Sequence, residues 1–158
     1  MRSTFLRKLD GNAQRLRRLY LPKRFSKTGN YTSDQYLNAA AFRILIYAEL
    51  EEYIESFAQN TLEAICNQAA AGKFCAGSTT LMATFANSLP GFPSQIGEIK
   101  NKSFLGRSLG LCKFEYTKRI SANKGARANH ILNLFVALGV DETSVDLQLL
   151  IDLNTLGA

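Results

Sequence analysis

The longest stretch of this sequence without a helix-breaking residue runs from residue 33 to residue 71. No Gly or Pro interrupts it, and Gly72 follows it directly. Thr32 and Gln35 have the spacing of a capping box, in which two side chains satisfy the first unpaired N–H groups of a helix. Gly often ends a helix, because it adopts positive φ without strain. The segment therefore predicts one long helix over about residues 33–71.

The length of this helix constrains the shape of the whole protein. At 1.5 Å per residue, the unbroken helix would be about 55–60 Å long. A compact domain of 158 residues has a radius of gyration of only about 15 Å. We therefore expect either a kinked helix or the long central helix of an elongated bundle. Its apolar stripe, at helical spacing, consists of Ile44, Tyr47, Leu50, Ile54, Phe57, Ala58, Leu62 and Ile65.

Apolar residues also recur at helical spacing in the rest of the chain, and no segment alternates like a strand. Further helices are predicted over residues 2–20, 79–89, 107–121, 129–138 and 144–156. Residues 10–12 are expected to break or kink the first of these, and Asn129 is expected to cap the helix that Gly139 ends. The predicted fold class is all-α, an elongated helical bundle with one long central helix, in a single domain over residues 1–158.

The composition excludes several classes of protein. Hydrophobic residues make up 46% of the 158 residues and charged residues 20%, which allows a buried core and argues against a disordered chain. There is no run of 18 apolar residues and no secretory signal, so we expect neither a membrane-spanning helix nor a membrane partner. Cys66, Cys75 and Cys112 lack Cys-x-x-Cys spacing, which predicts reduced thiols in a cytoplasmic protein. With His130 as the only histidine, no bound metal is expected.

Charged residues alternate in blocks along the chain. Residues 1–30 contain nine Lys/Arg and one acid, and residues 72–130 contain nine Lys/Arg and two acids. Residues 31–71 contain one base and six acids, and residues 131–158 contain four acids and no base. Basic blocks indicate a polyanionic partner such as nucleic acid. The alternative is intramolecular, with basic helices packed on acidic ones, and the sequence favours neither.

Two clusters of basic residues are candidates for binding phosphate groups. They are Arg15, Arg17 and Arg18 in the first predicted helix, and Lys118, Arg119, Lys124 and Arg127 before and at the start of a later one. Few aromatic residues lie between these bases, so a base-stacking surface for single strands is not indicated. Solvated helix faces would have the same composition, and this alternative stays open.

The sequence lacks the standard motifs for phosphate-binding loops, dinucleotide binding, zinc proteases and serine hydrolases. His130 belongs to the residue type that titrates near neutrality, and beside basic residues such as Lys124 it is a candidate general acid or base. The simpler interpretation, which we favour, is a histidine in the first turn of a helix. Glu51, Glu52 and Glu55 are closely spaced acids, but one histidine cannot complete a di-metal site, which favours a solvated acidic face.

Two segments acquire a meaning when they are considered together. Residues 36–55 read YLNAAAFRILIYAELEEYIE, an apolar run that leads into an acidic segment. Residues 123–140 read NKGARANHILNLFVALGV, with Asn, Gly, Phe and Gly at set offsets. The first resembles the long helix of the HEPN superfamily in its RiboL-PSP-HEPN branch, and the second resembles a stretch that follows it there. The two segments cover about a quarter of the chain, in the expected order.

The resemblance implies an all-α domain that can form a homodimer and that acts on RNA. Active members are metal-independent endoribonucleases that need no cofactor, and they serve as toxins, some with a cognate antitoxin or partner protein, or in phage defence. Their Arg-x4–6-His motif lies at the start of a late helix. The His exchanges a proton while the ribose 2′-OH attacks its own phosphate, and the Arg stabilises the charge that develops. Other members are inactive binding modules.

This chain departs from the family's motif. No Arg precedes His130 at the required distance, and the only basic residue there is Lys124. The usual place of the motif follows a segment that residues 153–156 resemble. We therefore expect the catalytic Arg and His beyond Ala158, in a longer protein of which this chain is a truncated part. On this interpretation the chain by itself is inactive, with His130 and Lys124 as weak catalytic candidates within it.

Three hypotheses about function remain. The first is a HEPN-like domain of a metal-independent endoribonuclease, and the second is a non-catalytic HEPN-like module that binds RNA or serves as an adaptor or for dimerisation. The third is an unrelated basic helical protein that binds nucleic acid by charge. Cleavage of RNA in EDTA distinguishes the first from the others, and a steep dependence of binding on salt indicates phosphate contacts.

Overall fold

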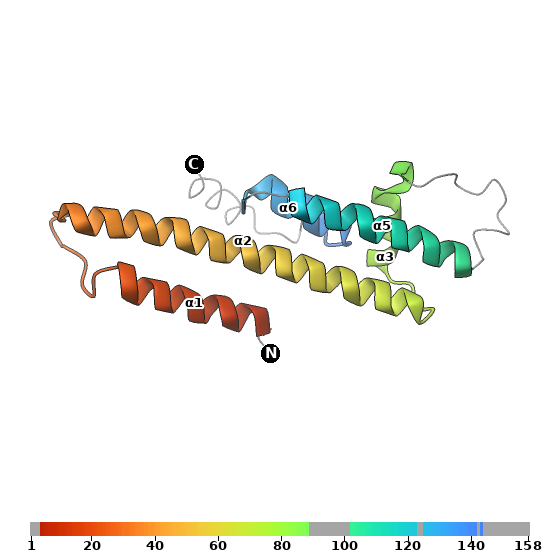
Figure 1. Cartoon of the computed structure of the whole chain (residues 1–158), viewed down its shortest axis with the longest axis horizontal. Helices are drawn as coiled ribbons and strands as arrows, with labels where there is room; N and C mark the ends of the chain where they lie inside the picture. Colours follow the sequence, from red (N-terminus) through yellow and green to blue (C-terminus); the bar gives the residue numbers. More distant parts are fainter. Residues whose placement is uncertain (1–3, 89–101, 123–124, 142, 144–158) are drawn as a thin grey trace.

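The computed structural model describes residues 4–88, 102–122, 125–141 and 143. Its elements are α1 (Thr4–Tyr20), α2 (Ser33–Ala70), α3 (Ala76–Thr84), the 3-10 turn η1 (Ala86–Ser88), α5 (Lys102–Ala122) and α6 (Ala128–Ala137). None of the described residues forms a strand. Figure 1 shows α2 running almost the full length of the molecule, with α1 on one side and α3, α5 and α6 on the other. The predicted all-α, elongated bundle around one long helix is confirmed.

The ends of α2 follow from local chemistry. The hydroxyl of Thr32 accepts the N–H of Gln35 at 3.3 Å, and the side-chain oxygen of Gln35 accepts the N–H of Thr32 at 2.9 Å, which is the predicted capping box. At the other end Gly72 has a φ of +80°, and its N–H donates to the carbonyl of Ala69 at 2.9 Å. The 38 residues between the two ends make a helix of about 57 Å.

The hydrophobic core lies between the C-terminal half of α2 and the three helices that cover it. The long helix contributes Ile54, Ala58, Leu62, Ile65 and Ala69 to this core. Residues with no exposed surface come from every one of the four helices: Leu62, Leu81, Cys112, Tyr116 and Leu134. Because burial of apolar surface is the main favourable term in folding, this half of the molecule carries most of the stability.

The helix α1 packs antiparallel to α2, along the N-terminal half of α2 (Figure 1). None of its residues is buried, and Leu19 is 64% exposed. The expected break at residues 10–12 is wrong, because α1 is continuous there. Gly11 has open space around it, and a glycine at an exposed helical position costs only about 1 kcal/mol relative to alanine.

The shorter helices differ from their predicted ranges. The helix predicted over residues 79–89 is α3, which begins at Ala76 and already ends at Thr84, and α5 begins at Lys102 rather than at residue 107. Ser78 begins α3 early, since its hydroxyl oxygen accepts the N–H of Cys75 at 2.9 Å and donates to the carbonyl of the same residue at 2.7 Å. The cap predicted at Asn129 is wrong, because Arg127 occupies the N-cap position of α6. Gly139 does follow the end of this helix as predicted, with a φ of +88°. Contacts to the backbone that begin a helix leave only a weak pattern in the sequence, whereas a glycine just after the end of a helix is easily recognised.

The helix predicted over residues 144–156 lies outside the described residues, as does the segment 89–101 between η1 and α5. Among the helices that are described, none combines the length and the apolar character needed to cross a membrane.

Candidate functional site

A hollow between α5 and α6 brings together two residues that the sequence singled out separately. It has a volume of about 330 Å³ and is lined by Arg119, Ala122, His130, Asn133 and Leu134. Arg119 lies in the last turn of α5, and His130 lies in the first turn of α6. We refer to this hollow as the α5–α6 pocket. It combines a guanidinium with an imidazole.

The guanidinium of Arg119 is held in place by contacts that include no acidic side chain of the described residues. It lies over the ring of Phe85, 4.6 Å from the ring centre, and one of its nitrogens donates to the backbone carbonyl of Asn133 at 3.4 Å. Stacking on an aromatic ring fixes the plane of an arginine while leaving its charge uncompensated. Most of its five N–H donors are therefore available to an anion, and a guanidinium binds phosphate in a bidentate manner.

The imidazole of His130 is oriented by the loop that precedes α6. Its Nδ1 lies 3.1 Å from the carbonyl oxygen of Gly125. Because a carbonyl oxygen only accepts hydrogen bonds, Nδ1 must carry the proton in this contact, which leaves Nε2 as the nitrogen that can gain or lose one. His130 is thus both the first-turn helix residue that the simpler interpretation predicted and a residue able to contact a ligand.

The loop itself is tied to the middle of α2. The N–H of Gly125 donates to the carboxylate of Glu51, and a side chain at Gly125 would contact the hydroxyl of Tyr47 at 3.2 Å. With a φ of +93°, position 125 also requires the left-handed conformation that favours glycine. A chain of contacts therefore runs from Glu51 through Gly125 to His130, and it fixes the imidazole relative to the long helix.

The other basic candidates of this region are placed differently. Lys118 pairs with Glu115 at 3.0 Å and lies over the ring of Phe114, so its charge is already partly engaged. Arg127 is exposed at the N-cap position of α6, and it does not line the α5–α6 pocket. Lys124 lies outside the described residues. The structure therefore brings Arg119 and His130 together. The sequence named them only among several candidate residues and could not tell which of these lie side by side.

The first basic cluster lies away from this pocket, at the end of the molecule where α1 passes into the turn before α2 (Figure 1). Arg17 and Arg18 line an open hollow of about 420 Å³ together with Lys23, where α1 ends and the turn toward α2 begins. Arg15 is exposed and is not part of this hollow. Cations in the last turn of a helix are stabilised by the helix dipole, so these arginines also have a structural reason to be there.

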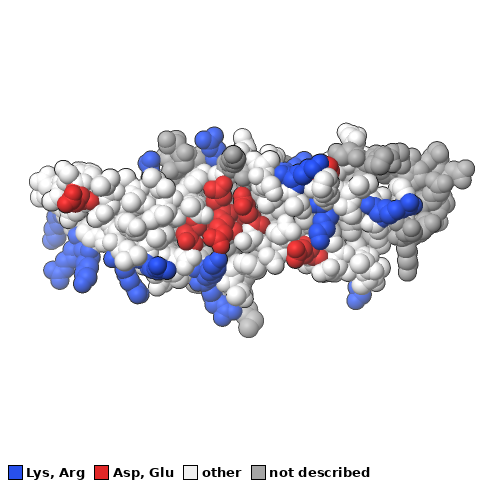
Figure 2. Space-filling model, in the orientation of Figure 1, with Lys and Arg blue, Asp and Glu red and all other residues white. Residues whose placement is uncertain are grey.

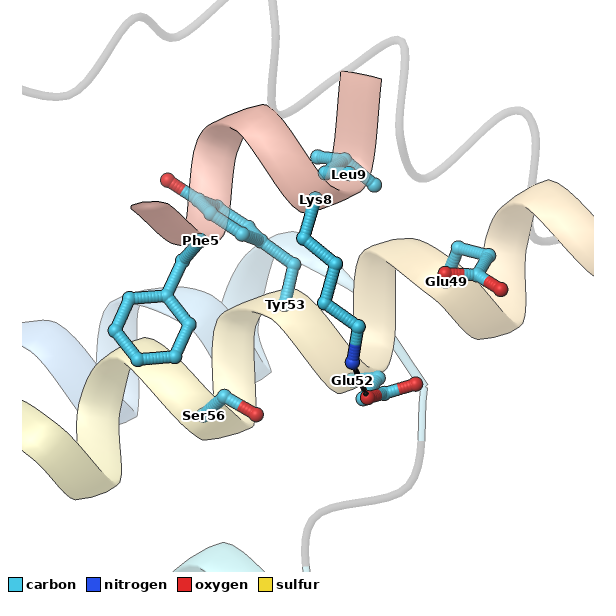
Figure 3. Close-up of a pocket in the computed structure, with 7 residues that line it drawn as sticks. All are labelled: Phe5, Lys8, Leu9, Glu49, Glu52, Tyr53 and Ser56. Atoms are coloured by element: carbon cyan, nitrogen blue, oxygen red, sulfur yellow. Dashed lines mark hydrogen bonds and ion pairs between the residues drawn. The ribbon is translucent and has the colours of Figure 1, made fainter. Parts of the chain in front are cut away.

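A third hollow lies between α1 and α2 and is structural in character (Figure 3). Its volume is only about 60 Å³. In it Lys8 donates to Glu52 at 2.6 Å, and one helical turn away Asn12 donates to Glu49 at 2.6 Å. The hydrogen bond to Glu52, together with the charge of that residue, raises the pKa of Lys8. The basic first block thus packs on the acidic second block, as the intramolecular interpretation predicted.

The acids in the middle of α2 form no metal site with their neighbours. In the described parts of the chain, no three His, Cys, Asp or Glu side chains are arranged to hold an ion. The three cysteines are free thiols, and burial raises the pKa of Cys112 to about 11, with the nearby Cys66 as a smaller cause. A thiol with so high a pKa is a weak nucleophile at neutral pH.

Sequence reasoning missed how three residues contribute to this site. Asn133 lines the α5–α6 pocket, and Phe85 stacks against Arg119. Glu51 was predicted to lie on a solvated acidic face, but it accepts the N–H of Gly125 instead. Asn133 follows His130 by three residues, a spacing that places both on one helical face and could have suggested it. Phe85 and Glu51 carry no such signal. They are 34 residues before Arg119 and 79 residues before His130 in the sequence, and only the packing of α3 and α2 brings them near.

The α5–α6 pocket can hold an anion at Arg119 and exchange a proton at Nε2 of His130. Both groups are positioned by contacts within the fold, which lowers the entropy lost when a ligand binds. Comparisons with protein-family models, with curated proteins and with solved structures find no match to this chain. The ligand must therefore be inferred from the chemistry of these side chains.

Proposed function

We propose that this chain is an RNA-binding helical domain of the HEPN-like type that holds a backbone phosphate in the α5–α6 pocket. The observation that carries the proposal is the guanidinium of Arg119, which pairs with no acid of the described residues, beside the imidazole of His130. A phosphodiester offers oxygens that accept from both groups, and phosphate contacts supply most of the affinity of nucleic-acid-binding proteins. The choice of RNA among polyanions rests on the resemblance of residues 36–55 and 123–140 to that family.

The proposal extends to the setting in which the domain acts. Its three thiols are free, in keeping with a reducing cytoplasmic compartment. Two hollows of the described surface are lined by basic side chains, one at the turn after α1 and one between α5 and α6. Figure 2 shows acidic side chains gathered at the middle of the molecule, with basic ones toward both ends.

A second candidate function is metal-independent cleavage of RNA, and it is favoured by the geometry of His130. With Nδ1 donating to Gly125, Nε2 is left to accept a proton from a ribose 2′-OH, while Arg119 can stabilise the charge on the attacked phosphate. The two residues come from different helices, so they do not reproduce the family's Arg-x4–6-His spacing. Binding without cleavage, as an adaptor module, is the remaining alternative.

A binding assay with matched charge variants tests the proposal. We expect fluorescence anisotropy with a structured RNA hairpin in EDTA to show affinity that falls steeply with salt. Arg119→Gln should weaken binding about tenfold at low salt and reduce the salt slope by about one. Arg107→Gln removes the same charge from an exposed position of the same helix, outside the pocket, and should change the affinity by less than about twofold.

The same experiment separates the competing functions. Equal losses in Arg119→Gln and Arg107→Gln would indicate binding by charge alone, without a pocket, and no binding at low salt would refute the proposal altogether. The cleavage arm follows product formation on a denaturing gel in EDTA. Cleavage that is lost in His130→Gln, while RNA affinity is retained, would establish the second candidate. If the wild-type chain leaves the RNA intact, the experiment supports binding and not cleavage.

A further inference from the structure

The α5–α6 pocket offers more than a phosphate group needs. Its volume of about 330 Å³ falls within the range of about 300–1,000 Å³ that is usual for pockets that bind whole small molecules. Arg119 and His130 supply the groups for a phosphate. The other lining residues carry no charge: Ala122, Asn133 and Leu134. The pocket therefore has both room and neutral surface for the nucleoside that is joined to the phosphate.

Asn133 lies next to both of the groups that would hold the phosphate. Its backbone carbonyl accepts from a guanidinium nitrogen of Arg119 at 3.4 Å. It also follows His130 by three residues in α6, a spacing that places both residues on one face of the helix. A nucleotide whose phosphate contacts Arg119 would therefore have its base within reach of Asn133.

The carboxamide of Asn133 has hydrogen-bonding groups to offer. The residue is exposed, and its side chain makes no hydrogen bond with the described residues, since only its backbone carbonyl is engaged. An asparagine carboxamide carries two N–H donors and an acceptor oxygen side by side. It adds no charge to attract a phosphate, but it can pair with a donor and an acceptor that are adjacent on the edge of a base.

The helix itself does not require an amide at this position. Asparagine is a poorer helix former than alanine, because its side chain competes for backbone hydrogen bonds. In the described part of the chain, no hydrogen bond of the Asn133 side chain offsets this cost. A contact to a ligand in the α5–α6 pocket gives the amide a use that the fold does not.

Among the bases of RNA, adenine matches a carboxamide on the largest number of edges. Its N6 donor lies beside the acceptor N7 on one edge and beside the acceptor N1 on the other. Guanine presents two acceptors, O6 and N7, on the edge that corresponds to the first of these, and the pyrimidines present a single polar group there. Adenine can therefore pair with an asparagine in two orientations, whereas the other bases can do so in one.

We propose that Asn133 reads the base of the nucleotide whose phosphate lies at Arg119, and that it selects an unpaired adenosine. The inference rests on the proposed phosphate-binding function of the same pocket. The adenosine must be unpaired, because a base inside a duplex has to be unstacked and unpaired before it can enter a pocket. Ala122, which is exposed at the end of α5, adds an apolar contact to the ring.

Fluorescence anisotropy in EDTA with a set of matched RNA hairpins tests the inference. Four hairpins share one stem and one loop without adenine, and differ only in a single bulged nucleotide, which is A, G, C or U. A fifth hairpin has no bulge. We expect the hairpin with the bulged A to bind at least about fivefold more tightly than the other four. Asn133→Ala should reduce this preference to less than about twofold, and it should leave the affinity for the hairpin without a bulge unchanged.

A second asparagine of the same helix provides the matched control. Asn129 is exposed in the first turn of α6 and does not line the pocket, so Asn129→Ala should keep the preference of the wild-type chain. Alanine is the best helix former, so both variants should retain α6, which circular dichroism checks.

The outcomes separate this inference from the function on which it rests. Equal affinity for the four bulged hairpins, a preference for a base other than adenine, or a preference that survives Asn133→Ala would overturn the inference. In each of these cases, a loss of affinity for all five hairpins in Arg119→Gln would still support the phosphate site. If Arg119→Gln changes no affinity, the phosphate site itself is refuted, and the reading of the base is refuted with it.

Discussion

At the scale of single residues, Tyr116 determines how α5 and α6 are joined. Its ring is fully buried, and its hydroxyl donates to the backbone carbonyl of Leu134 at 2.8 Å. Burial raises the pKa of this phenol above its ordinary value, so the hydroxyl stays protonated and remains a donor over the physiological range. The bond satisfies a carbonyl in the last turn of α6, where helices leave carbonyls without an internal partner.

We expect Tyr116→Phe to lower the free energy of unfolding by about 1–3 kcal/mol, because it leaves the carbonyl of Leu134 buried without its donor. Chemical denaturation followed by circular dichroism measures the change. Tyr20→Phe removes a hydroxyl for which no described hydrogen bond exists, and it should cost far less. Equal effects of the two variants would mean that the buried hydrogen bond contributes nothing beyond the ring.

At the scale of elements, two glycines mark the point where α3 meets the end of α6. A Cβ at Gly77 would lie 2.7 Å from the side chain of Ile65 and 2.8 Å from the backbone carbonyl of Leu138. Gly139 combines a φ of +88° with a Cβ position only 3.0 Å from the backbone of Gly77. The two helices can approach this closely only because both positions lack side chains.

A pair of Gly→Ala variants should therefore have effects of opposite sign. Gly77→Ala should destabilise the protein by about 1–3 kcal/mol, because the backbone of Leu138 cannot yield to the added methyl group. Gly110→Ala, in the middle of α5 with nothing within 4 Å of its Cβ position, should stabilise it by about 0.5–1 kcal/mol. Thermal melts compare the two, and a loss of stability in Gly110→Ala would contradict the described surface of α5.

Local signals explain why some elements could be predicted and others could not. Thr32, Gln35 and Gly72 determine where α2 starts and ends, because they form hydrogen bonds with backbone groups within four residues. The N-cap residue of α6, Arg127, makes no capping hydrogen bond with its side chain, so no residue nearby in the sequence predicts where this helix begins. Gly11 predicted a break in the first helix, but α1 is continuous because its packing on α2 outweighs the low helix propensity of glycine, which costs about 1 kcal/mol.

At the scale of the whole molecule, stability is distributed unevenly along α2. Its C-terminal half is buried against three helices, whereas its N-terminal half contacts α1, which buries no residue completely. The backbone hydrogen bonds are similar throughout the helix, so the difference lies in packing. Segments with few buried apolar contacts open at lower free energy than the global unfolding reaction.

Hydrogen exchange at low protein concentration should reveal this division. We expect the amides of residues 36–48 to exchange at least about tenfold faster than those of residues 54–69, because opening them disrupts little buried surface. Mass spectrometry of peptides from the two halves gives the measurement, with the peptides of α5 as an internal reference for the core. Uniform protection along α2 in the dilute protein would contradict the uneven stability described above.

The sequence by itself determined the helical class, the single long helix and the alternation of charge, because each depends on residues close together in the chain. It also identified Arg119 and His130 as candidates, but as members of larger sets. Only the tertiary structure decided which members meet. The ring of Phe85 and the carboxylate of Glu51 position these two side chains from distant segments. Such contacts are set by packing over the whole molecule, which no local pattern encodes.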